Sequence, residues 1–198
     1  MEKLLIATSN KHKIDEISKI LTDVGISVLS INDFSNHPQV IEDRYTLAGN
    51  ARKKAVEFAE YFDLPALADD TGLEVDALNG APGVFSARYA GENAGYDENV
   101  NKLLQELKAV PPNLRTARFR TVMALAIGRQ VFTVEGLCEG IITRNRRGDK
   151  GFGYDPVFFV PELNKTFAEM TLEEKNRTSH RGRALEKLRT LLIEKFGA

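Results

Sequence analysis

Two adjacent carboxylates are the most chemically suggestive feature of this sequence. Asp69 and Asp70 close the segment LPALADD, whose apolar run predicts a buried strand that ends at these residues. Burial of an unpaired carboxylate is costly, so a cation, a metal ion or a substrate is expected beside them. Mg²⁺ commonly takes one or two protein carboxylates together with phosphate oxygens and water. A turn in which the two side chains cap backbone N–H groups is an equally good reading of this segment alone.

Two further side chains are candidates for the same chemistry. Glu42 lies in the polar segment QVIEDRYT and is a possible second carboxylate, although most glutamates in loops are simply solvated. Lys54 falls on the mostly apolar face of a helix predicted over residues 46–62. Its ammonium group would then reach into a polar site, whereas snorkelling to solvent is the commoner alternative.

The N-terminal segment ATSNKHK has the features of an anion site. A buried strand predicted over residues 3–8 runs directly into Thr8, Ser9 and Asn10, and a helix follows at once, for which Asn10 or Ser9 is a good N-cap. Unpaired backbone N–H groups at such a helix start attract anions. Lys13 lies in the first helical turn, where the helix dipole disfavours a cation unless an anion is close by. An ordinary capped helix is the alternative, and the spacing does not match a Walker loop.

The glycine-rich segment KGFGYDP is a candidate for base recognition. Phe152 or Tyr154 could stack on a base, and Asp155 could accept a hydrogen bond from a ring N–H group. The alternative is a loop whose aromatic side chains cover the core, and the segment by itself favours that reading.

The segment EEKNRTSHRGRAL precedes a strongly helical tail. Ser179 is a plausible N-cap for that tail. Lys175 lies before this cap, and His180 and Arg181 beside it could hold a carbonyl or phosphate oxygen. A basic helix start with solvated charges is the alternative.

The elements that must position these side chains alternate along the chain. Helices are predicted over residues 9–21, 46–62, 96–107 and from 171 into the tail, and strands over 3–8, 26–31, 64–70, 116–127, 130–143 and 156–161. The two long strands form a hairpin around Gly128 and Arg129. This order predicts one α/β domain over residues 1–198, with a mixed twisted sheet flanked by helices.

Bulk composition excludes several classes of protein. The chain has 198 residues, of which 42% are hydrophobic, and this composition fits a globular protein. Its formal net charge is −1, so the chain lacks the overall positive charge that attracts nucleic acid. The single cysteine, Cys138, lies in an alternating apolar run and is expected to fill the core. Neither a signal peptide nor a membrane-spanning apolar run is visible, so we expect a cytoplasmic protein with no membrane partner.

Taken together, the motifs resemble the inosine/xanthosine triphosphate pyrophosphatase family. The stretches ATSNKHK, ADDTGLEVDALNGAPGVFSARYAG, GFGYDPVFF and SHR occur in the family's order over about 175 residues. Each would be weak alone, and the series is highly specific. One departure is Ser9, where relatives often carry glycine; serine still fits if its backbone needs no positive φ.

The resemblance implies a fold, an activity and a set of site residues. The implied fold is an elongated mixed sheet between two lobes with an active cleft, assembled as a homodimer. Glu42 and Asp70 would bind Mg²⁺, and Asp70 would also be the general base, with Asp69 in support. The implied substrate-binding residues are Thr8, Ser9, Asn10, Lys11, His12, Lys13, Lys54, Thr71, Phe152, Gly153, Tyr154, Asp155, Lys175, His180 and Arg181.

The implied reaction is hydrolysis of a deaminated purine nucleoside triphosphate, such as ITP, dITP or XTP, to the monophosphate and pyrophosphate. Water attacks the α-phosphorus, which needs charge neutralisation and an aligned nucleophile. Donors on His180 and Arg181 would match a 6-oxo group, whereas adenine would present another donor. This argument does not separate ITP from GTP, which shares the 6-oxo group.

Two other readings use the same residues. A related pyrophosphatase acting on pyrimidine or methylated nucleotides would keep the phosphate chemistry and change the base pocket. A non-catalytic nucleotide sensor or an RNA-binding module would hydrolyse nothing. The formal net charge of −1 and the lack of a basic, aromatic stripe argue against RNA.

Overall fold

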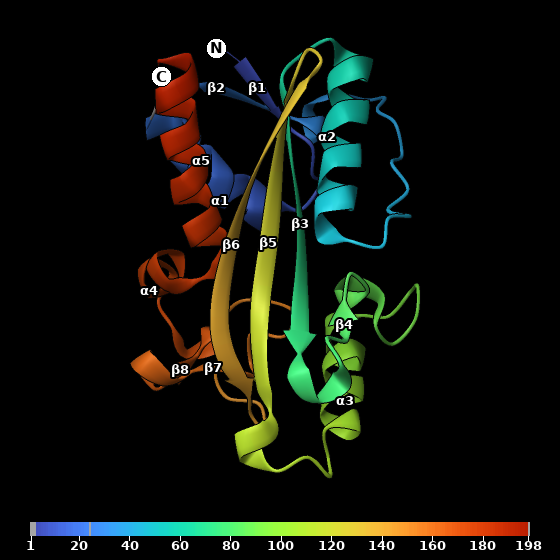
Figure 1. The fold of residues 1–198 in the computed structure, drawn as a ribbon, viewed down its shortest axis with the longest axis vertical. Helices are drawn as coiled ribbons and strands as arrows, with labels where there is room; N and C mark the ends of the chain where they lie inside the picture. The colour runs from blue at the N-terminus through green and yellow to red at the C-terminus, as the bar shows by residue number, and fades with distance from the viewer. Residues whose placement is uncertain (1–2, 24, 198) are drawn as a thin grey trace. The chain divides into compact units, whose positions relative to one another are not determined.

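A mixed eight-stranded sheet organises the protein, as seen in a computed structural model (Figure 1). The structure describes residues 3–23 and 25–197, without the side chains of residues 12, 20 and 23. The strands follow the order β2-β1-β3-β5-β6-β7-β8, and β4 pairs with β3. The strands are β1 (Lys3–Ile6), β2 (Ser27–Ser30), β3 (Ala66–Val75), β4 (Pro82–Gly83), β5 (Thr116–Ile127), β6 (Gln130–Ile142), β7 (Phe158–Val160) and β8 (Lys165–Thr166).

The described residues form five α-helices. They are α1 (Lys11–Asp23), α2 (Leu47–Phe62), α3 (Tyr96–Glu106), α4 (Leu172–Thr178) and α5 (His180–Phe196). The first three connect strands, and the other two, α4 and α5, follow the last strand. The predicted mixed sheet with flanking helices is therefore confirmed, and the predicted hairpin strands correspond to β5 and β6. No helix in the part of the chain that the structure describes is long and apolar enough to cross a membrane.

The chain divides into two compact units. The first unit comprises the residues up to Asp70, Thr121–Gly136 and the residues from Arg183 onwards, and the second comprises Thr71–Arg120 and Leu137–Gly182. Each unit has its own buried apolar cluster, so each is described by itself.

The first unit is built on parallel strands. β1 pairs in parallel with β2 and with β3, so Leu5 lies opposite both Leu29 and Ala66. Helix α1 buries Ile17 and Leu21 against the sheet because these residues recur at helical spacing. Each fully buried side chain of this size contributes about 1.5–3 kcal/mol relative to exposure. The remaining cluster residues include Leu4, Ile6, Leu67, Met123, Leu125, Leu188 and Leu192.

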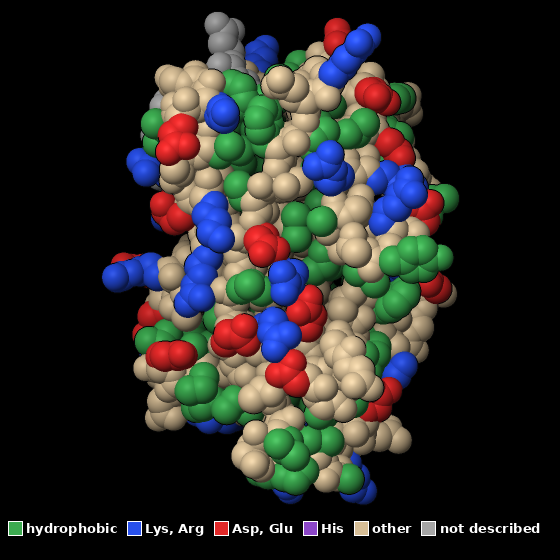
Figure 2. Space-filling model, in the orientation of Figure 1, with side chains coloured by type: hydrophobic (Ala, Val, Ile, Leu, Met, Phe, Trp, Pro, Cys, Tyr) green, Lys and Arg blue, Asp and Glu red, His purple; other side chains and the backbone are tan. Residues whose placement is uncertain are grey.

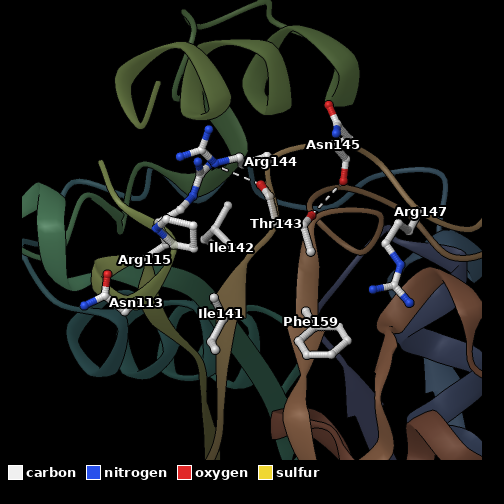
Figure 3. A pocket seen from close by; sticks show the side chains of 10 residues that line it. Asn113, Arg115, Ile141, Ile142, Thr143, Arg144, Asn145, Arg147 and Phe159 are labelled. Carbon is white, nitrogen blue, oxygen red and sulfur yellow. Dashed lines mark hydrogen bonds between the residues drawn. The ribbon is translucent and has the colours of Figure 1, made fainter. Parts of the chain in front are cut away.

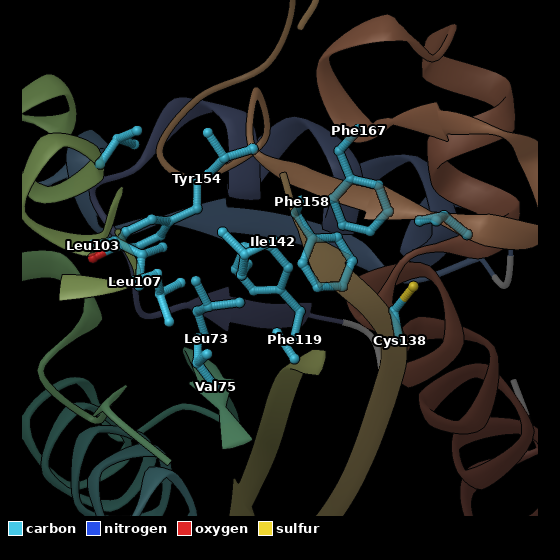
Figure 4. Packing of buried hydrophobic residues seen from close by; sticks show 14 of the residues in the cluster. Leu73, Val75, Leu103, Leu107, Phe119, Cys138, Ile142, Tyr154, Phe158 and Phe167 are labelled. Carbon is cyan, nitrogen blue, oxygen red and sulfur yellow. The ribbon is translucent and has the colours of Figure 1, made fainter. Parts of the chain in front are cut away.

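The second unit has an aromatic core (Figure 4). Phe119 lies 4.7 Å from Phe158 and 5.8 Å from Phe167 between ring centroids, within the range of favourable aromatic pairs. Leu103 of α3 and the free thiol of Cys138 are also buried in this cluster. The prediction that Cys138 fills the core is therefore confirmed.

One sequence prediction about β3 is wrong. The strand does not end at Asp69 and Asp70 but continues to Val75, and both carboxylates are buried inside it. The strand continues because Leu73 and Val75, both fully buried, supply core contacts beyond the charged pair. The two-residue strand β8 was also absent from the sequence prediction.

Candidate active site

Asp69 has a cationic partner from the start of α1. Its Oδ2 atom lies 2.8 Å from Nζ of Lys13, and the Asp69 side chain is fully buried. The helix dipole disfavours a lysine in the first turn of α1, and this contact compensates for that cost. Lys13 is therefore held by a buried carboxylate, which fixes the position of its ammonium group.

Asp70 is held by a buried amide that the sequence analysis missed. Nδ2 of Asn50 donates to Oδ2 of Asp70 at 3.1 Å, and Oδ1 of Asn50 accepts from the backbone N–H of Arg44 at 2.9 Å. Asn50 is 1% exposed. It thus connects Asp70 to the segment that contains Glu42. The available signal was a polar residue one helical turn before Lys54, on the same face of α2.

Lys54 lies among three acidic residues of the first unit. Its Nζ atom is 2.5 Å from Oε1 of Glu42 and donates to the backbone carbonyl of Asp69 at 2.7 Å. Burial alone would lower the pKa of Lys54, but the charges of Asp69, Glu42 and Asp70 together raise it. The structure therefore brings Lys54, Glu42 and Asp70 together, although they are distant in the sequence.

The environment of Asp70 suits a proton acceptor. Burial raises the pKa of Asp70 to about 6, and the charge of Glu42 acts in the same direction. Lys54, the Asn50 amide and Lys13 oppose this shift without cancelling it. A carboxylate with a pKa close to neutrality can accept a proton in water-attack chemistry.

The donor set of this site fits a hard divalent cation. The described residues contain no cluster of three or more metal-ligating side chains. The charge of Glu42 nevertheless raises the pKa of Asp70, so the site provides two carboxylates. Mg²⁺ typically binds one or two carboxylates and completes its shell with substrate phosphates and water. Two carboxylates are therefore a sufficient protein contribution for a cation of this kind.

The start of α1 has the predicted cap. Oδ1 of Asn10 accepts from the backbone N–H of Lys13 at 3.4 Å, and Oγ1 of Thr8 accepts from the N–H of Asn10 at 3.3 Å. Ser9 and Lys11 are exposed. Among the described residues the non-glycine positions with positive φ are Asp63, Asn79 and Asn164, so Ser9 replaces glycine without strain. The side chain of His12, another predicted site residue, lies outside the described part.

A second group of predicted site residues lies in the second unit, around Asp155. Oδ2 of Asp155 accepts from Nζ of Lys175 at 2.6 Å and from the backbone N–H of Phe152 at 2.9 Å. Gly151 has a φ of +76°, and a Cβ atom there would lie 2.0 Å from Oδ2 of Asp155. The loop therefore requires glycine at this position so that its backbone can wrap around the carboxylate.

The two aromatic candidates of this loop have different surroundings. Phe152 is half-buried, with Nζ of Lys175 5.0 Å from its ring centroid and the ring of Tyr96 at 5.9 Å. Tyr154 is buried in the aromatic core, and its hydroxyl donates to the backbone carbonyl of Ser86 at 2.9 Å. Of the two rings, Phe152 has the accessible position. Gly153, between them, is half-buried with a φ of +61°.

His180 and Arg181 begin α5 in a buried setting. Oγ of Ser179 accepts from the N–H of Gly182 at 3.2 Å, which confirms the predicted N-cap. The imidazole of His180 stacks on Phe119 at 4.6 Å between centroids, so packing fixes its orientation. Arg181 is 4% exposed.

The remaining predicted residue, Thr71, is half-buried in β3 and directly follows Asp70. The structure brings Lys13, Glu42 and Lys54 together with Asp69 and Asp70 in the first unit. It brings Phe152 and Lys175 together with Asp155 in the second unit.

Comparison with known proteins identifies the family. The model of the Ham1 family matches residues 4–191. The chain belongs to the Ham1 family. A relative named dITP/XTP pyrophosphatase, from Desulforamulus reducens, is 52% identical over 191 residues, covering 96% of this chain and 95% of that protein. The relative of the same name from Geobacter sulfurreducens is 52% identical over 190 residues, covering 96% of each chain.

A solved structure agrees with this assignment. The HAM1 protein from Coxiella burnetii is 44% identical and superposes with a TM-score of 0.91, covering 98% of this chain and 100% of that chain. The resemblance inferred from the four sequence motifs is therefore confirmed at the level of family and fold.

Proposed function

We propose that this Ham1-family protein hydrolyses deaminated purine nucleoside triphosphates, such as ITP, dITP and XTP, to the monophosphate and pyrophosphate in a Mg²⁺-dependent reaction. The relatives named dITP/XTP pyrophosphatase support the substrate class. The observation that carries the proposal is the buried Asp70, whose pKa is raised to about 6 beside Glu42 and Lys54.

The first unit supplies the phosphate chemistry in this proposal. Glu42 and Asp70 hold Mg²⁺, which, when bound, neutralises phosphate charge and acidifies water. Lys13 and Lys54 bind phosphate oxygens, and Asp69 keeps Lys13 in place through their 2.8 Å contact. Backbone N–H groups at the start of α1, with Thr8 and Asn10, bind the triphosphate.

Asp70 acts as the general base. It accepts a proton from the attacking water as the bond from that oxygen to the α-phosphorus forms. The bond between the α-phosphorus and the bridging oxygen breaks, and pyrophosphate leaves. Asn50 keeps the accepting carboxylate oriented through its 3.1 Å hydrogen bond.

The second unit supplies base recognition. Phe152 stacks on the purine, and the Lys175–Asp155 pair fixes the backbone that presents this ring. His180 and Arg181 donate to the 6-oxo group. Adenine would leave such buried donors facing its amino group, and mismatches of this kind can cost a factor of about 10⁴ in kcat/KM.

The proposal also includes an assembly and a location. The protein would work as a homodimer in the cytoplasm, on free nucleotides rather than on nucleic acid. The formal net charge of −1 supports free nucleotides as the substrates, because a nucleic-acid surface normally carries clustered positive charge.

Product analysis tests the proposal. The purified protein is incubated with ITP and Mg²⁺, and we expect IMP and pyrophosphate in equal amounts, with no turnover after chelation by EDTA. A panel of XTP, dITP, dTTP, UTP, ATP and GTP separates this activity from one on pyrimidine nucleotides. Release of inorganic phosphate with IDP, or intact ITP after long incubation, would contradict the proposal.

A further inference from the structure

A second potential binding site lies in the second unit, among residues that have no part in the proposed hydrolysis. It is a surface cavity of about 640 Å³ between the start of β5 and the segment that follows β6 (Figure 3). Its principal lining residues are Arg115, Ile141, Ile142, Arg144, Arg147 and Phe159. The described residues that line it include no carboxylate.

Arg115 is buried in the wall of this cavity and has no acidic partner among the described residues. It is 2% exposed, and its guanidinium group donates to the backbone carbonyls of Leu107 at 3.4 Å and Thr143 at 3.0 Å. Its Nε atom is buried and has no hydrogen-bond partner among the described residues. A guanidinium group has five N–H donors and usually has an anionic partner when buried. Arg115 therefore retains an unused donor, Nε, in the wall of the cavity.

Arg144 adds a second positive charge on the same side. It is exposed and has no ion pair within the part of the chain that the structure describes, and its side chain lies beside that of Arg115 in Figure 3. Burial lowers the pKa of Arg115, and the charge of Arg144 lowers it further. Two guanidinium groups side by side repel each other. An anion between them would attract both groups and offset this repulsion.

The opposite side of the cavity is apolar and electrically balanced. Nη2 of Arg147 lies 3.1 Å from Oε2 of Glu169, and its guanidinium carbon lies 5.2 Å from the ring centroid of Phe159. In Figure 3 the side chains of Phe159 and Ile141 lie away from the guanidinium groups of Arg115 and Arg144. One side thus suits an oxyanion and the other suits a ring.

We propose that this cavity binds a small organic oxyanion, a phosphate or carboxylate group carried on an apolar ring. The oxyanion accepts hydrogen bonds from Arg115 and Arg144, whose planar guanidinium groups match its geometry. The ring lies against Ile141 and Phe159. The bound molecule thus compensates the charges of Arg115 and Arg144 and covers the apolar side chains of Ile141 and Phe159.

Titration of the full chain with three probes tests this site. Phenyl phosphate, benzoate and inorganic phosphate are added separately, and binding is followed by calorimetry and by amide shifts in two-dimensional NMR. We expect saturable binding of a ring-bearing probe, at least tenfold tighter than inorganic phosphate, with shifts at Ile142 and Thr143. Tighter binding of phenyl phosphate than of benzoate assigns the site to phosphate esters, and the reverse order assigns it to carboxylates.

Two exposed arginines of the same loop give a matched pair of variants. Arg144→Gln removes a charge that lines the cavity, whereas Arg146→Gln removes one that contacts Asp97 and Asn101 instead. We expect Arg144→Gln to weaken binding at least tenfold and Arg146→Gln to change it less than twofold. Melting temperatures verify that both variants are folded, and Arg115→Lys provides a second cavity variant.

Two outcomes would overturn the inference. One is the absence of saturable binding by either ring-bearing probe, and the other is equal binding by the Arg144→Gln and Arg146→Gln variants. Both outcomes are read from binding and not from ITP hydrolysis, which we expect to change less than twofold in either variant. Failure of this inference is therefore distinguishable from failure of the proposed function.

Discussion

Two aspartates of the same chain segment illustrate how environment separates a reactive carboxylate from a structural one. Asp70 is 7% exposed in β3, and burial raises its pKa to about 6. Asp76 directly follows β3 and is exposed; its pKa is lowered, mainly by a hydrogen bond from Thr116 and further by Arg118. The identity of the residue thus does not set its chemistry, because burial and the supply of donors decide which protonation state is favoured.

Neighbouring donors compensate the negative charge of Asp76. Oγ1 of Thr116 donates to it at 2.6 Å, and Nη2 of Arg118 lies 2.7 Å away. Nε of Arg118 also lies 3.3 Å from Oε1 of Glu139. Figure 2 shows acidic and basic side chains alternating over β3, β5 and β6. Exposed pairs of this kind are worth about 0–1 kcal/mol each. Asp76 therefore stabilises the fold slightly, whereas ionised Asp70 opposes it.

The largest expected effect is on turnover in Asp70→Asn. Asparagine keeps the shape and can still accept the hydrogen bond from Asn50, but it cannot accept a proton from water. We expect kcat for ITP to fall by about 10²–10⁴-fold, as for loss of a general base. Steady-state pyrophosphate release measures this loss. Wild-type rates in this variant would remove Asp70 from the role of base.

The same substitution should stabilise the metal-free protein. Folding raises the pKa of Asp70 from 3.8 to about 6, so the folded chain binds the proton more tightly than the unfolded chain. Stability conferred by this group therefore falls as the pH rises from about 4 to about 6. In urea titrations with EDTA at pH 8, we expect the free energy of unfolding of Asp70→Asn to be about 1–3 kcal/mol larger than that of the wild type. The gain should shrink towards pH 4, and a pH-independent difference would contradict the burial argument.

Removal of the positioning amide should have a smaller effect with a specific signature. In Asn50→Ala, Asp70 loses a hydrogen bond that lowers its pKa. We expect kcat to fall about 10–100-fold, as for partners that orient a ligand. The acidic limb of the kcat profile should move to higher pH.

Asn99 provides the matched control for that variant. It is 2% exposed in α3 and bonds the backbone N–H of Ala90 at 2.7 Å and the carbonyl of Ala87 at 3.0 Å. Asn99→Ala should lower stability without moving the pH profile. If the two variants had the same kcat–pH profile, Asn50 would have only a structural role.

The smallest expected effect is that of Asp76→Asn. Because the pKa of Asp76 is lowered, its ionised form stabilises the fold above pH 3.8, and this contribution is lost as the pH falls through the lowered pKa. We expect a loss below about 1 kcal/mol at pH 7, weaker in high salt, with ITP turnover unchanged. A large loss of turnover in this variant would contradict the assignment of Asp76 as a structural residue and of Asp70 as the reactive one.

Short-range patterns in the sequence were sufficient to predict most elements and the N-caps of α1 and α5. Helical spacing identified α1 and α2, and alternation identified the hairpin of β5 and β6. Asn10 and Ser179 cap their helices through contacts three residues away. The four motifs also identified the family. Such features depend on hydrogen bonds and periodicity within a few residues, which a linear sequence displays directly.

Only the tertiary structure decided which side chains become partners. It joined Lys13 to Asp69 and Asn50 to Asp70, placed Tyr154 in the core, and continued β3 through two charges. It also buried Arg115, for which the described residues offer no acidic partner. These outcomes depend on contacts between segments 20 or more residues apart, and on the burial that follows from them. Burial sets the electrostatic cost of a charge, so the chemistry of Asp70 is a property of the folded chain.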